Sequence, residues 1–271
     1  MDPDLLAPTR IPAGNAPHLA QRDARDTLGL RDKAHGHQLR DDLLDELRDL
    51  QTRLWAEDER ALLLVLQGMD TAGKDGTIRR VFSGVNPQGV RVAGFKAPSD
   101  NELDRDYLWR VHQVVPRRGE LGIFNRSHYE DVTVVHVLGL VPDPRWRARY
   151  RHIRDFEQLL VDEGTTVVKV FLHISRDEQR ERLQARLDEP TKRWKFDRGD
   201  LDIRARWDDF TTAYEEAITE TSTGAAPWHV VPADRRWVRD AVVAQLLVST
   251  LRTMDPKVPA ADPELDDVVI T

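Results

Sequence analysis

Residues 68–76 read Gly68-Met69-Asp70-Thr71-Ala72-Gly73-Lys74-Asp75-Gly76. They follow the continuously apolar run Ala61–Gln67 and precede a segment, residues 77–82, that we expect to be helical. An apolar run of this kind is typical of a parallel strand buried on both faces. Between a strand and a helix, a glycine-framed loop ending in Gly-Lys surrounds phosphate oxygens with backbone N–H groups and one ammonium. We therefore predict a phosphate-binding loop and a polyanionic ligand.

The end of this loop departs from the common pattern G-x-x-x-x-G-K-[ST], whose final hydroxyl holds Mg²⁺. Asp75 occupies the hydroxyl position and is followed by Gly76 and Thr77, so a metal must be held in another way. Asp70 lies inside the loop, where a negative charge beside phosphates is costly unless a divalent cation lies between them. We interpret Asp70 as the first candidate metal ligand. The alternative is a carboxylate that only caps the helix or turns the chain.

Composition excludes several classes of protein. The chain has 271 residues and no cysteine, so it has neither a disulfide scaffold nor a thiolate metal site. Its formal net charge of −7 argues against a general nucleic-acid binder, which needs a broad basic face. The N-terminus does not resemble a signal peptide, and no apolar run is long enough to span a membrane. We expect a cytoplasmic protein that binds neither nucleic acid nor membranes.

Strands and helices are expected to alternate along the chain. Further strands are predicted at residues 90–95, 121–124, 166–174 and 228–231, and helices at residues 37–58, 100–114, 145–162, 177–187, 205–221 and 235–251. In the first helix, apolar side chains recur at helical spacing, at Leu39, Leu43, Leu47, Leu50 and Leu54. The alternation predicts an α/β fold of three layers, in which helices cover both faces of a parallel five-stranded sheet. Ligands then bind at the carboxyl ends of the strands.

The expected organisation is a single main domain with two extensions. Residues 1–36 lack an apolar period and are predicted to form an extended N-terminal arm. Residues 37–254 form the domain that carries the phosphate loop, including a helical lid at about residues 175–205. Residues 255–271 are rich in proline and aspartate and are predicted to be a flexible tail.

A second polar cluster, Asn125–Val132, follows the predicted third strand. An aspartate often ends this strand in nucleotide-binding folds and holds magnesium, but here that position is Asn125. We favour Asp131 over Glu130 as a second metal ligand. Asp131 could instead cap the next helix, and Arg126 could simply pair with a carboxylate. His128 is assigned a structural or orienting role, because a terminal phosphate acceptor needs no general base.

The predicted lid begins at Ser175–Glu178, which has the form of a capping box. Arg182 and Arg186 then share one helix face, and basic residues follow Pro190, namely Lys192, Arg193 and Lys195. Such a segment is suited to closing over phosphates. Two alternatives stay open, since Glu178 could pair with Arg182 on a solvated face, and Trp194 and Phe196 could form a stacking platform for a base.

Several ordered motifs together resemble the polyphosphate kinase 2 family over roughly Leu39 to Met254. They are Gly68–Gly76, Phe95–Pro98, Asp106–His112, Phe124–Val132, Lys192–Phe196 and Ala226–Trp228. The resemblance implies a P-loop core like that of thymidylate kinase, a lid, and activity on inorganic polyphosphate, a nucleotide and magnesium. The form of residues 125–131 resembles the single-domain subgroup that phosphorylates both AMP and ADP.

The resemblance also implies roles for individual residues. Asp70 and Lys74 are expected to be essential, Arg126 to bind phosphate, and Asp131 to be a metal-associated carboxylate, and these four are the predicted catalytic residues. The predicted phosphate- and substrate-binding residues are Gly73, Asp75, Gly76, Thr77, Lys96, Arg110, Glu130, Arg182, Arg186, Lys192, Arg193 and Lys195. The predicted metal is Mg²⁺ on Asp70 and Asp131, with Mn²⁺ as a substitute.

The expected reaction is reversible in-line transfer of a terminal phosphoryl group from polyphosphate to ADP or AMP. Guanine nucleotides as acceptors and a homo-oligomeric state are left open. One alternative is an ATP-dependent nucleoside monophosphate kinase on the same fold, against which Asp75 argues. Another is a non-catalytic nucleotide-binding regulatory protein, which would need fewer carboxylates than Asp70, Glu130 and Asp131 supply.

Overall fold

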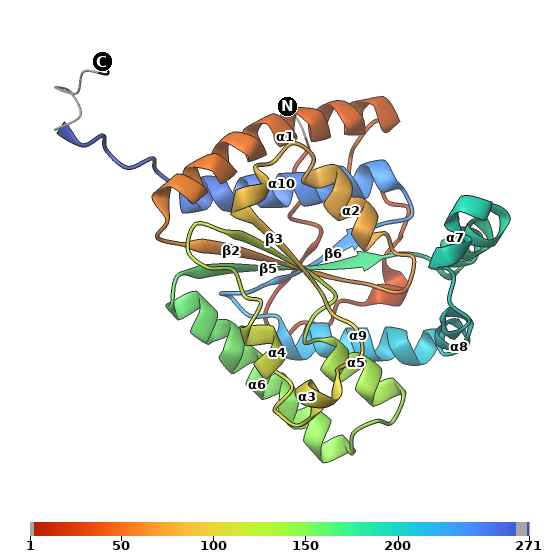
Figure 1. Cartoon of the computed structure of the whole chain (residues 1–271). Coiled ribbons are helices and arrows are strands. Elements are labelled where there is room, and N and C mark those ends of the chain that lie inside the picture. The colour runs from red at the N-terminus through yellow and green to blue at the C-terminus, as the bar shows by residue number, and fades with distance from the viewer. Residues whose placement is uncertain (1–2, 264–269, 271) are drawn as a thin grey trace.

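The chain folds into three layers, with a twisted central sheet between two groups of helices (Figure 1). The computed structural model describes residues 3–263 and residue 270. In these residues, six strands follow the spatial order β1-β6-β5-β2-β4-β3 and have the bounds β1 Arg10–Ile11, β2 Ala61–Gln67, β3 Val90–Gly94, β4 Leu121–Asn125, β5 Thr165–His173 and β6 Trp228–Pro232. The α-helices are α1 Lys33–Glu57, α2 Lys74–Val81, α3 Asp100–Leu103, α4 Trp109–His112, α5 Glu130–Val137, α6 Asp143–Asp162, α7 Arg176–Asp188, α8 Gly199–Ala205, α9 Trp207–Thr221 and α10 Arg236–Met254.

Strand β2 lies at the centre of the sheet and is buried at every position. It pairs in parallel with β4 on one side and β5 on the other, while β3 and β6 extend the parallel sheet outward. The predicted α/β fold with its five parallel strands is confirmed. Because parallel strands share one direction, the carboxyl ends of β2, β3 and β4 meet at the same edge, where the phosphate loop and the second polar cluster begin.

A sixth strand corrects the predicted strand count. Strand β1 pairs antiparallel with β6, so that Arg10 lies opposite His229 and Ile11 lies opposite Trp228. Two residues are too few to show the alternating pattern by which strands are recognised in a sequence. Their pairing depends on the exposed edge of β6, which sequence reasoning did not place.

The N-terminal segment, predicted as an extended arm over residues 1–36, is mostly irregular from residue 3 to residue 32 but packs closely against the domain. Leu5, Ile11, Leu19 and Leu30 are each at most 2% exposed. These apolar side chains are widely and irregularly spaced, so no helical or strand period reveals them. Residues 33–36 belong to α1, which begins four residues earlier than predicted because Asp32 caps it by accepting from the His35 N–H at 2.8 Å.

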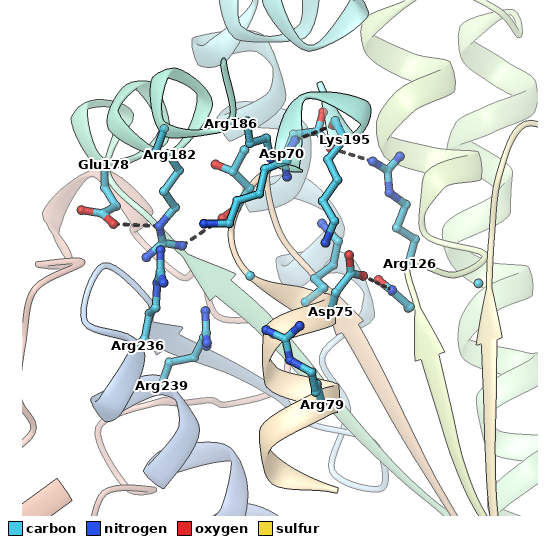
Figure 2. A pocket seen from close by; sticks show the side chains of 18 of the residues that line it. Asp70, Asp75, Arg79, Arg126, Glu178, Arg182, Arg186, Lys195, Arg236 and Arg239 are labelled. Carbon is cyan, nitrogen blue, oxygen red and sulfur yellow. Dashed lines mark hydrogen bonds and ion pairs between the residues drawn. The ribbon is translucent and has the colours of Figure 1, made fainter. Parts of the chain in front are cut away.

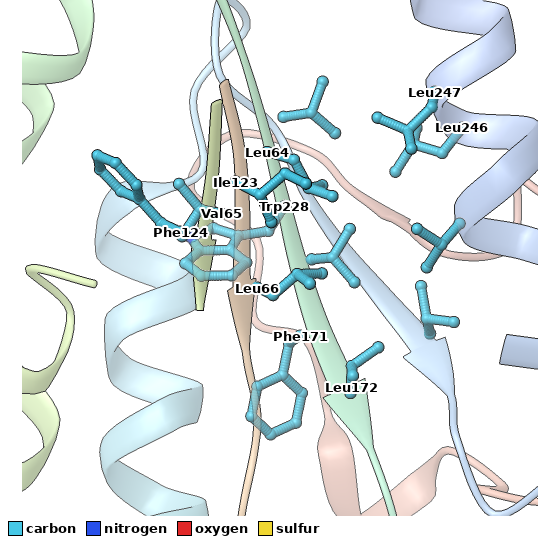
Figure 3. Close-up of a cluster of buried hydrophobic side chains, with 14 of the residues drawn as sticks. Leu64, Val65, Leu66, Ile123, Phe124, Phe171, Leu172, Trp228, Leu246 and Leu247 are labelled. Atoms are coloured by element: carbon cyan, nitrogen blue, oxygen red, sulfur yellow. The ribbon is translucent and has the colours of Figure 1, made fainter. Parts of the chain in front are cut away.

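Helices cover both faces of the sheet (Figure 1). Helices α1, α2 and α10 lie on one face, and α4, α5, α6 and α9 lie on the other. The predicted apolar stripe of α1 is buried as expected. Between the sheet and the helices lies a core of large apolar side chains (Figure 3), among them Leu64, Val65, Leu66, Ile123, Phe124, Phe171, Leu172, Trp228, Leu246 and Leu247. This core fixes the strand ends on which the functional loops stand.

The predicted helix over residues 100–114 is wrong as a single element, because the chain forms two short helices there. Helix α3 ends at Leu103, and α4 begins only at Trp109. The Asp106 carboxylate accepts from the backbone N–H groups of Leu108 and Trp109 at 3.0 and 3.1 Å. An aspartate that bonds the backbone ahead of it favours a turn over a continuous helix.

The segment predicted as a lid joins β5 to α9 and projects beside the carboxyl edge of the sheet (Figure 1). It consists of α7, the 3₁₀-helix Pro190–Lys195 and α8. The tail predicted to be flexible over residues 255–271 falls partly outside the described residues, at 264–269 and 271. No helix among residues 3–263 and 270 is both long and apolar enough to cross a membrane.

Candidate active site

An open cleft of about 840 Å³ lies at the carboxyl edge of the sheet (Figure 2). The phosphate loop, the ends of β3 and β4, the lid and the start of α10 contribute its walls. Eleven of the lining residues are lysine or arginine, namely Lys74, Arg79, Arg80, Lys96, Arg126, Arg182, Arg186, Lys192, Lys195, Arg236 and Arg239. Only four are acidic, namely Asp70, Asp75, Glu178 and Glu181. The chain as a whole is acidic, but its cleft carries an excess of positive charge. Such a cleft suits a ligand with many closely spaced negative charges.

The backbone of the phosphate loop depends on its glycines. Gly68 and Gly73 have φ angles of +149° and +105°, which side chains with a Cβ rarely adopt. A Cβ at Gly68 would lie 2.7 Å from the Leu172 carbonyl oxygen, and one at Gly73 would lie 1.9 Å from Arg239 Nη1. Thr71 also has a positive φ, of 66°. The loop is therefore held in a conformation that few sequences tolerate, and α2 begins directly after Gly73.

Lys74 is folded back into the phosphate loop. Its Nζ donates to the Gly68 carbonyl at 2.7 Å and to the Met69 carbonyl at 3.4 Å. Burial lowers the pKa of this ammonium to about 8, because the charged form is poorly solvated there. Lys74 lies in the cleft wall, so a phosphate entering the loop would offer it a negatively charged partner in place of two neutral carbonyls.

Arg126 connects the second polar cluster to the phosphate loop. Its Nη2 donates to Asp70 Oδ1 at 2.6 Å, and its Nη1 lies 3.5 Å from Glu130 Oε2. Its backbone has a φ of +63°, which is an unfavourable value for an arginine. Figure 2 shows its side chain at the edge of the cleft. Burial raises the pKa of Glu130, although Arg126 and Lys74 oppose that shift. Thus Arg126, Asp70, Glu130 and Lys74 form one compact charge cluster.

The residues that follow Lys74 differ in their placement. Asp75 lines the cleft and accepts from the Asn125 amide at 2.6 Å, which links the two polar motifs directly. Gly76 also lines the cleft. Thr77, which we predicted to bind phosphate, is fully buried and donates its hydroxyl to the Gly73 carbonyl at 3.2 Å. Its role in this structure is to close the first turn of α2.

Asp131 and Arg110, which we predicted to bind metal and phosphate, are not among the described residues that line the cleft. The Asp131 carboxylate lies 3.2 Å from Arg110 Nη2 and 3.4 Å from Arg149 Nη1. Arg110 also donates to the Lys96 carbonyl at 2.9 Å. Burial raises the pKa of Asp131, and the two arginines oppose the shift. On α5, Asp131 is rotated by about 100° from Glu130, so the two side chains contact different partners.

The cations of the lid fall into two groups. Lys192 and Lys195, which we predicted to bind substrate, line the cleft. Lys96 also lines it, but from the segment that follows β3, outside the lid. Arg186 lines it as well, but its Nη1 donates to the Lys195 carbonyl and to Asp200, both at 3.2 Å. Arg193 does not line the cleft, and its Nε donates to the Leu187 carbonyl at 2.7 Å. Arg193 therefore stabilises the end of α7.

Arg182 lines the cleft, and its guanidinium is already engaged by groups of the protein. Its guanidinium donates to the Thr71 and Ala72 carbonyls of the phosphate loop at 2.9 and 3.1 Å. It also donates to the Ala233 and Asp234 carbonyls at 2.7 and 2.9 Å, and it pairs with Glu178 at 2.7 Å. The alternative pairing with Glu178 is confirmed, but Arg182 is buried and Glu178 half-buried instead of both lying on a solvated face. Arg182 ties α7, the loop and the end of β6 together.

Sequence reasoning missed four arginines of the cleft, namely Arg79, Arg80, Arg236 and Arg239. Arg236 and Arg239 follow the carboxyl end of β6, where the rule that ligands gather at strand ends would have identified them. Arg79 and Arg80 lie one to two turns into α2, close to the loop that the sequence singled out. His128 is fully buried, 3.4 Å from Glu157, and takes no part in the cleft.

Metal ligands are sparse around this cleft. The described residues contain no group of three or more histidine, aspartate and glutamate side chains placed to hold a metal ion. Two carboxylates, Asp70 and Asp75, nevertheless lie in the cleft wall beside the phosphate loop. Mg²⁺ is commonly bound through one or two carboxylates together with phosphate oxygens and water. The donor set therefore fits Mg²⁺ that arrives with a phosphate ligand.

A phosphate loop on a parallel sheet, a second polar cluster at the neighbouring strand and a basic lid define a phosphotransferase of the P-loop kinase class. The sequence profile of polyphosphate kinase 2 (PPK2) matches residues 30–259. The chain belongs to this polyphosphate kinase 2 family, as its sequence motifs indicated.

Individual relatives agree with the family assignment. The chain is 59% identical over 224 residues to the AMP/ADP-polyphosphate phosphotransferase of Meiothermus ruber, covering 83% of this chain and 84% of that protein. It is 45% identical over 243 residues to the ADP-polyphosphate phosphotransferase of Rhodopseudomonas palustris, covering 85% and 84%. The crystal structure of polyphosphate kinase 2 from Arthrobacter aurescens TC1 matches with a TM-score of 0.91 and 44% identity, covering 97% of this chain and 95% of that one.

Proposed function

We propose that this protein transfers the terminal phosphoryl group of inorganic polyphosphate to ADP and AMP. The observation that carries the proposal is the cleft itself, where eleven cationic residues surround one phosphate loop. Two polyanions can meet there only if their mutual repulsion is offset, and this ring of charge supplies the offset. The names of the Meiothermus and Rhodopseudomonas relatives support the same donor and the same acceptors.

The wall of the cleft favours a donor without a base. An ATP donor needs an apolar or aromatic surface for adenine, as nucleotide pockets usually provide. On the side of α7 and α10, the described lining consists largely of charged side chains, namely Glu178, Glu181, Arg182, Arg236 and Arg239. A chain of phosphates uses guanidinium groups at every unit, whereas a purine does not. This argues for polyphosphate over ATP as the donor.

The acceptor is better placed on the side of β3. Phe95 is the single aromatic residue among the described residues that line the cleft, and it follows the end of β3. Its ring lies in an edge-on contact with Phe124, with 5.0 Å between the ring centroids, so it is firmly held. Lys96 and Arg126 lie in the same wall and can meet the acceptor phosphates. Figure 2 shows Arg126 on the opposite side of the cleft from Arg236 and Arg239.

Mg²⁺ fits beside the loop, where Asp70 would hold it and Asp75 offers a second oxygen ligand. When bound, the ion would neutralise charge on the transferred phosphoryl group. Asp131, the other predicted metal ligand, does not line the cleft, and Arg110 and Arg149 engage its carboxylate, so we assign the ion to Asp70 and Asp75. The Asp70–Arg126 pair keeps both partners aligned at the place where donor and acceptor would meet.

The protein's own side chains then perform three tasks. The phosphate loop and Lys74 hold the terminal phosphates of the donor, Arg126 orients the acceptor phosphate for in-line attack, and the lid cations cover the bound chain. No general base is required, because the attacking phosphate oxygen is already ionised at neutral pH. Exchange of one phosphoanhydride for another also makes the step reversible, so that concentrations set its direction.

A direct assay tests this function. Purified protein is mixed with Mg²⁺, long-chain polyphosphate and ADP, with no ATP supplied, and nucleotides are followed by phosphorus NMR and chromatography. The expected result is ATP formation, and with AMP in place of ADP, formation of ADP followed by ATP. A reaction without polyphosphate controls for ATP made from two ADP molecules. If no product depends on polyphosphate, the proposal fails.

A further inference from the structure

A buried carboxylate, Asp240, lies behind the phosphate loop and outside the cleft lining. It is 1% exposed and stands in the first turns of α10. Its Oδ1 accepts from Arg239 Nε and Nη2 at 3.0 and 2.8 Å, and its Oδ2 accepts from Arg80 Nε. One carboxylate therefore fixes two guanidinium groups that both belong to the cleft wall.

These two guanidinium groups lie against Gly73, which directly precedes α2, and Gly76, in the first turn of α2. A Cβ at Gly73 would lie 1.9 Å from Arg239 Nη1, and a Cβ at Gly76 would lie 3.0 Å from Arg80 Nη2. Each arginine thus occupies the space that a side chain on its glycine would need. The position of Arg239 and the path of the loop at Gly73 are consequently coupled, while Arg80 packs against the first turn of its own helix.

Arg239 also sets the direction of a peptide unit in the loop. Its Nη1 donates to the Ala72 carbonyl at 3.2 Å, and Arg182 donates to the same carbonyl at 3.1 Å. In a trans peptide the carbonyl and the next N–H point in opposite directions. Holding the Ala72 carbonyl against two guanidinium groups therefore turns the Gly73 N–H the other way. Gly73 lines the cleft, where backbone N–H groups bind phosphate.

We propose that Asp240 is a positioning residue for phosphoryl transfer, which acts by fixing Arg80 and Arg239 against the phosphate loop. The inference rests on the function proposed above and deepens it. Without the Asp240 carboxylate, Arg239 is a charge buried in the interior with no ion partner, and it must move or draw water inward. Either response displaces the Ala72 carbonyl and the Gly73 N–H from their positions.

The test compares Asp240→Asn with the wild-type protein, because the amide keeps the shape of the side chain and removes its charge. We expect kcat to fall about 100-fold, since small misplacements of a reacting group have effects of that size. KM for ADP should stay within about twofold, because Asp240 lies on the donor side of the cleft. Calorimetric titration with tripolyphosphate should show affinity weakened about tenfold, which corresponds to one misaligned hydrogen bond.

Leu247→Ala is the matched control. Leu247 is fully buried on α10, two turns beyond Asp240, and takes no part in the cleft. This variant should lower the melting temperature while leaving kcat and tripolyphosphate affinity at wild-type values. A purely structural role for Asp240 predicts the same pattern for Asp240→Asn. Wild-type kcat in a folded Asp240→Asn protein would overturn the proposal.

A second variant covers the case in which Asp240→Asn does not fold. Arg239→Lys keeps the buried positive charge but replaces the planar fork, which reaches Asp240 and the Ala72 carbonyl from different nitrogens, with a single nitrogen. It should show the same fall in kcat and in tripolyphosphate affinity, and wild-type values would again overturn the proposal. An inactive wild-type protein would defeat the proposed function, whereas equal activity of wild type and variants would defeat only this inference.

Discussion

The cleft joins two basic regions that use their charges in opposite ways. Behind the phosphate loop, the side chains of Arg182 and Arg239 are 8% and 1% exposed, and both donate to loop carbonyls while each pairs with one carboxylate. In the lid, Lys192 and its partner Glu189 are about half exposed, with 3.8 Å between their charged atoms. Lys195 lies 5.0 Å from the ring of Trp194, which is 78% exposed. Both regions are rich in positive charge, so the number of charges does not distinguish them.

The difference lies in what each charge already binds. Buried arginines that satisfy the protein's own carbonyls shape the loop, so their removal should change turnover and stability. Exposed lysines with weak partners are available to a ligand, so their removal should change affinity and its dependence on salt. The expected outcomes below test this division, beginning with the largest effect.

Lys74→Ala should have the largest effect on turnover. The change removes the one ammonium inside the phosphate loop, and loss of a single preorganised group that stabilises developing charge typically lowers kcat by about 10²–10³-fold. Steady-state kinetics with polyphosphate and ADP measure it, with circular dichroism as a check that the fold is intact. A kcat within about threefold of wild type would contradict the role of Lys74.

Asp70→Asn should lower kcat by about 10²-fold, because it removes the proposed Mg²⁺ ligand and weakens the pair with Arg126. The substitution keeps the side-chain shape, so the melting temperature should change little. Raising Mg²⁺ should restore part of the activity if the metal site is weakened, and this titration separates metal loss from a pairing effect. Full activity at low Mg²⁺ would remove the metal assignment.

Arg182→Gln tests whether Arg182 stabilises the folded protein or mainly binds substrate. Removing the charge leaves Glu178 and the carbonyls of Thr71, Ala233 and Asp234 without this donor, while the Ala72 carbonyl keeps only Arg239, so the free energy of unfolding should fall by about 3 kcal/mol. Urea denaturation measures this change. Arg180→Gln is the control on the same helix, because Arg180 is exposed and lies 3.7 Å from Asp177, and its effect should stay within about 0.5 kcal/mol. Equal stability of the two variants would contradict the stabilising role of Arg182.

Activity should also decline in alkaline solution. Burial lowers the pKa of Lys74 to about 8, so in the free protein its positive charge is present below that pH and is lost above it. We expect kcat/KM for polyphosphate to fall by about tenfold for each pH unit above 8. The decline in kcat should occur at higher pH, because bound phosphates favour the ammonium form. A kcat/KM that stays constant to pH 10 would contradict this prediction.

Lys195→Ala should have the smallest effect, which should fall on affinity. We expect KM for polyphosphate to rise by about threefold with kcat nearly unchanged, as for a single exposed ion pair. The salt dependence of KM should become shallower, because fewer counterions are released on binding. Arg193→Ala is the matched control, since Arg193 lies in the same segment but outside the cleft lining. A larger loss of kcat in Lys195→Ala than in Arg182→Gln would contradict the proposed division between buried structural arginines and exposed ligand-binding lysines.

Much of the fold could be predicted because its signals are local. The apolar run of β2 and the glycine loop lie next to each other in the sequence, and the stripe of α1 repeats at a fixed period. Strand β1 and the break between α3 and α4 were missed for opposite reasons. The first depends on a distant pairing with β6, and the second on one side chain, Asp106, that competes with helical bonding.

The site was predictable at the level of motifs more than of single side chains. Asp70, Lys74, Asp75 and Arg126 lie together because one loop and one strand end carry them. The orientation of Asp131 depends on Arg149 of α6, and the burial of Arg182 depends on carbonyls from two other segments. Contacts of this kind come from tertiary packing and have no signature in residue spacing.

The exposed indole of Trp194 gives this protein its own optical reporter. It sits beside Lys195 in the lid, whereas Trp146 and Trp228 are at most 1% exposed in the core. Any closing motion of the lid onto a bound polyanion would carry this indole out of water, shift its emission to the blue and shield it from a dissolved quencher. The other tryptophans are buried or half-buried, so Trp194 would give the largest change in emission and substrate binding could be timed without a label.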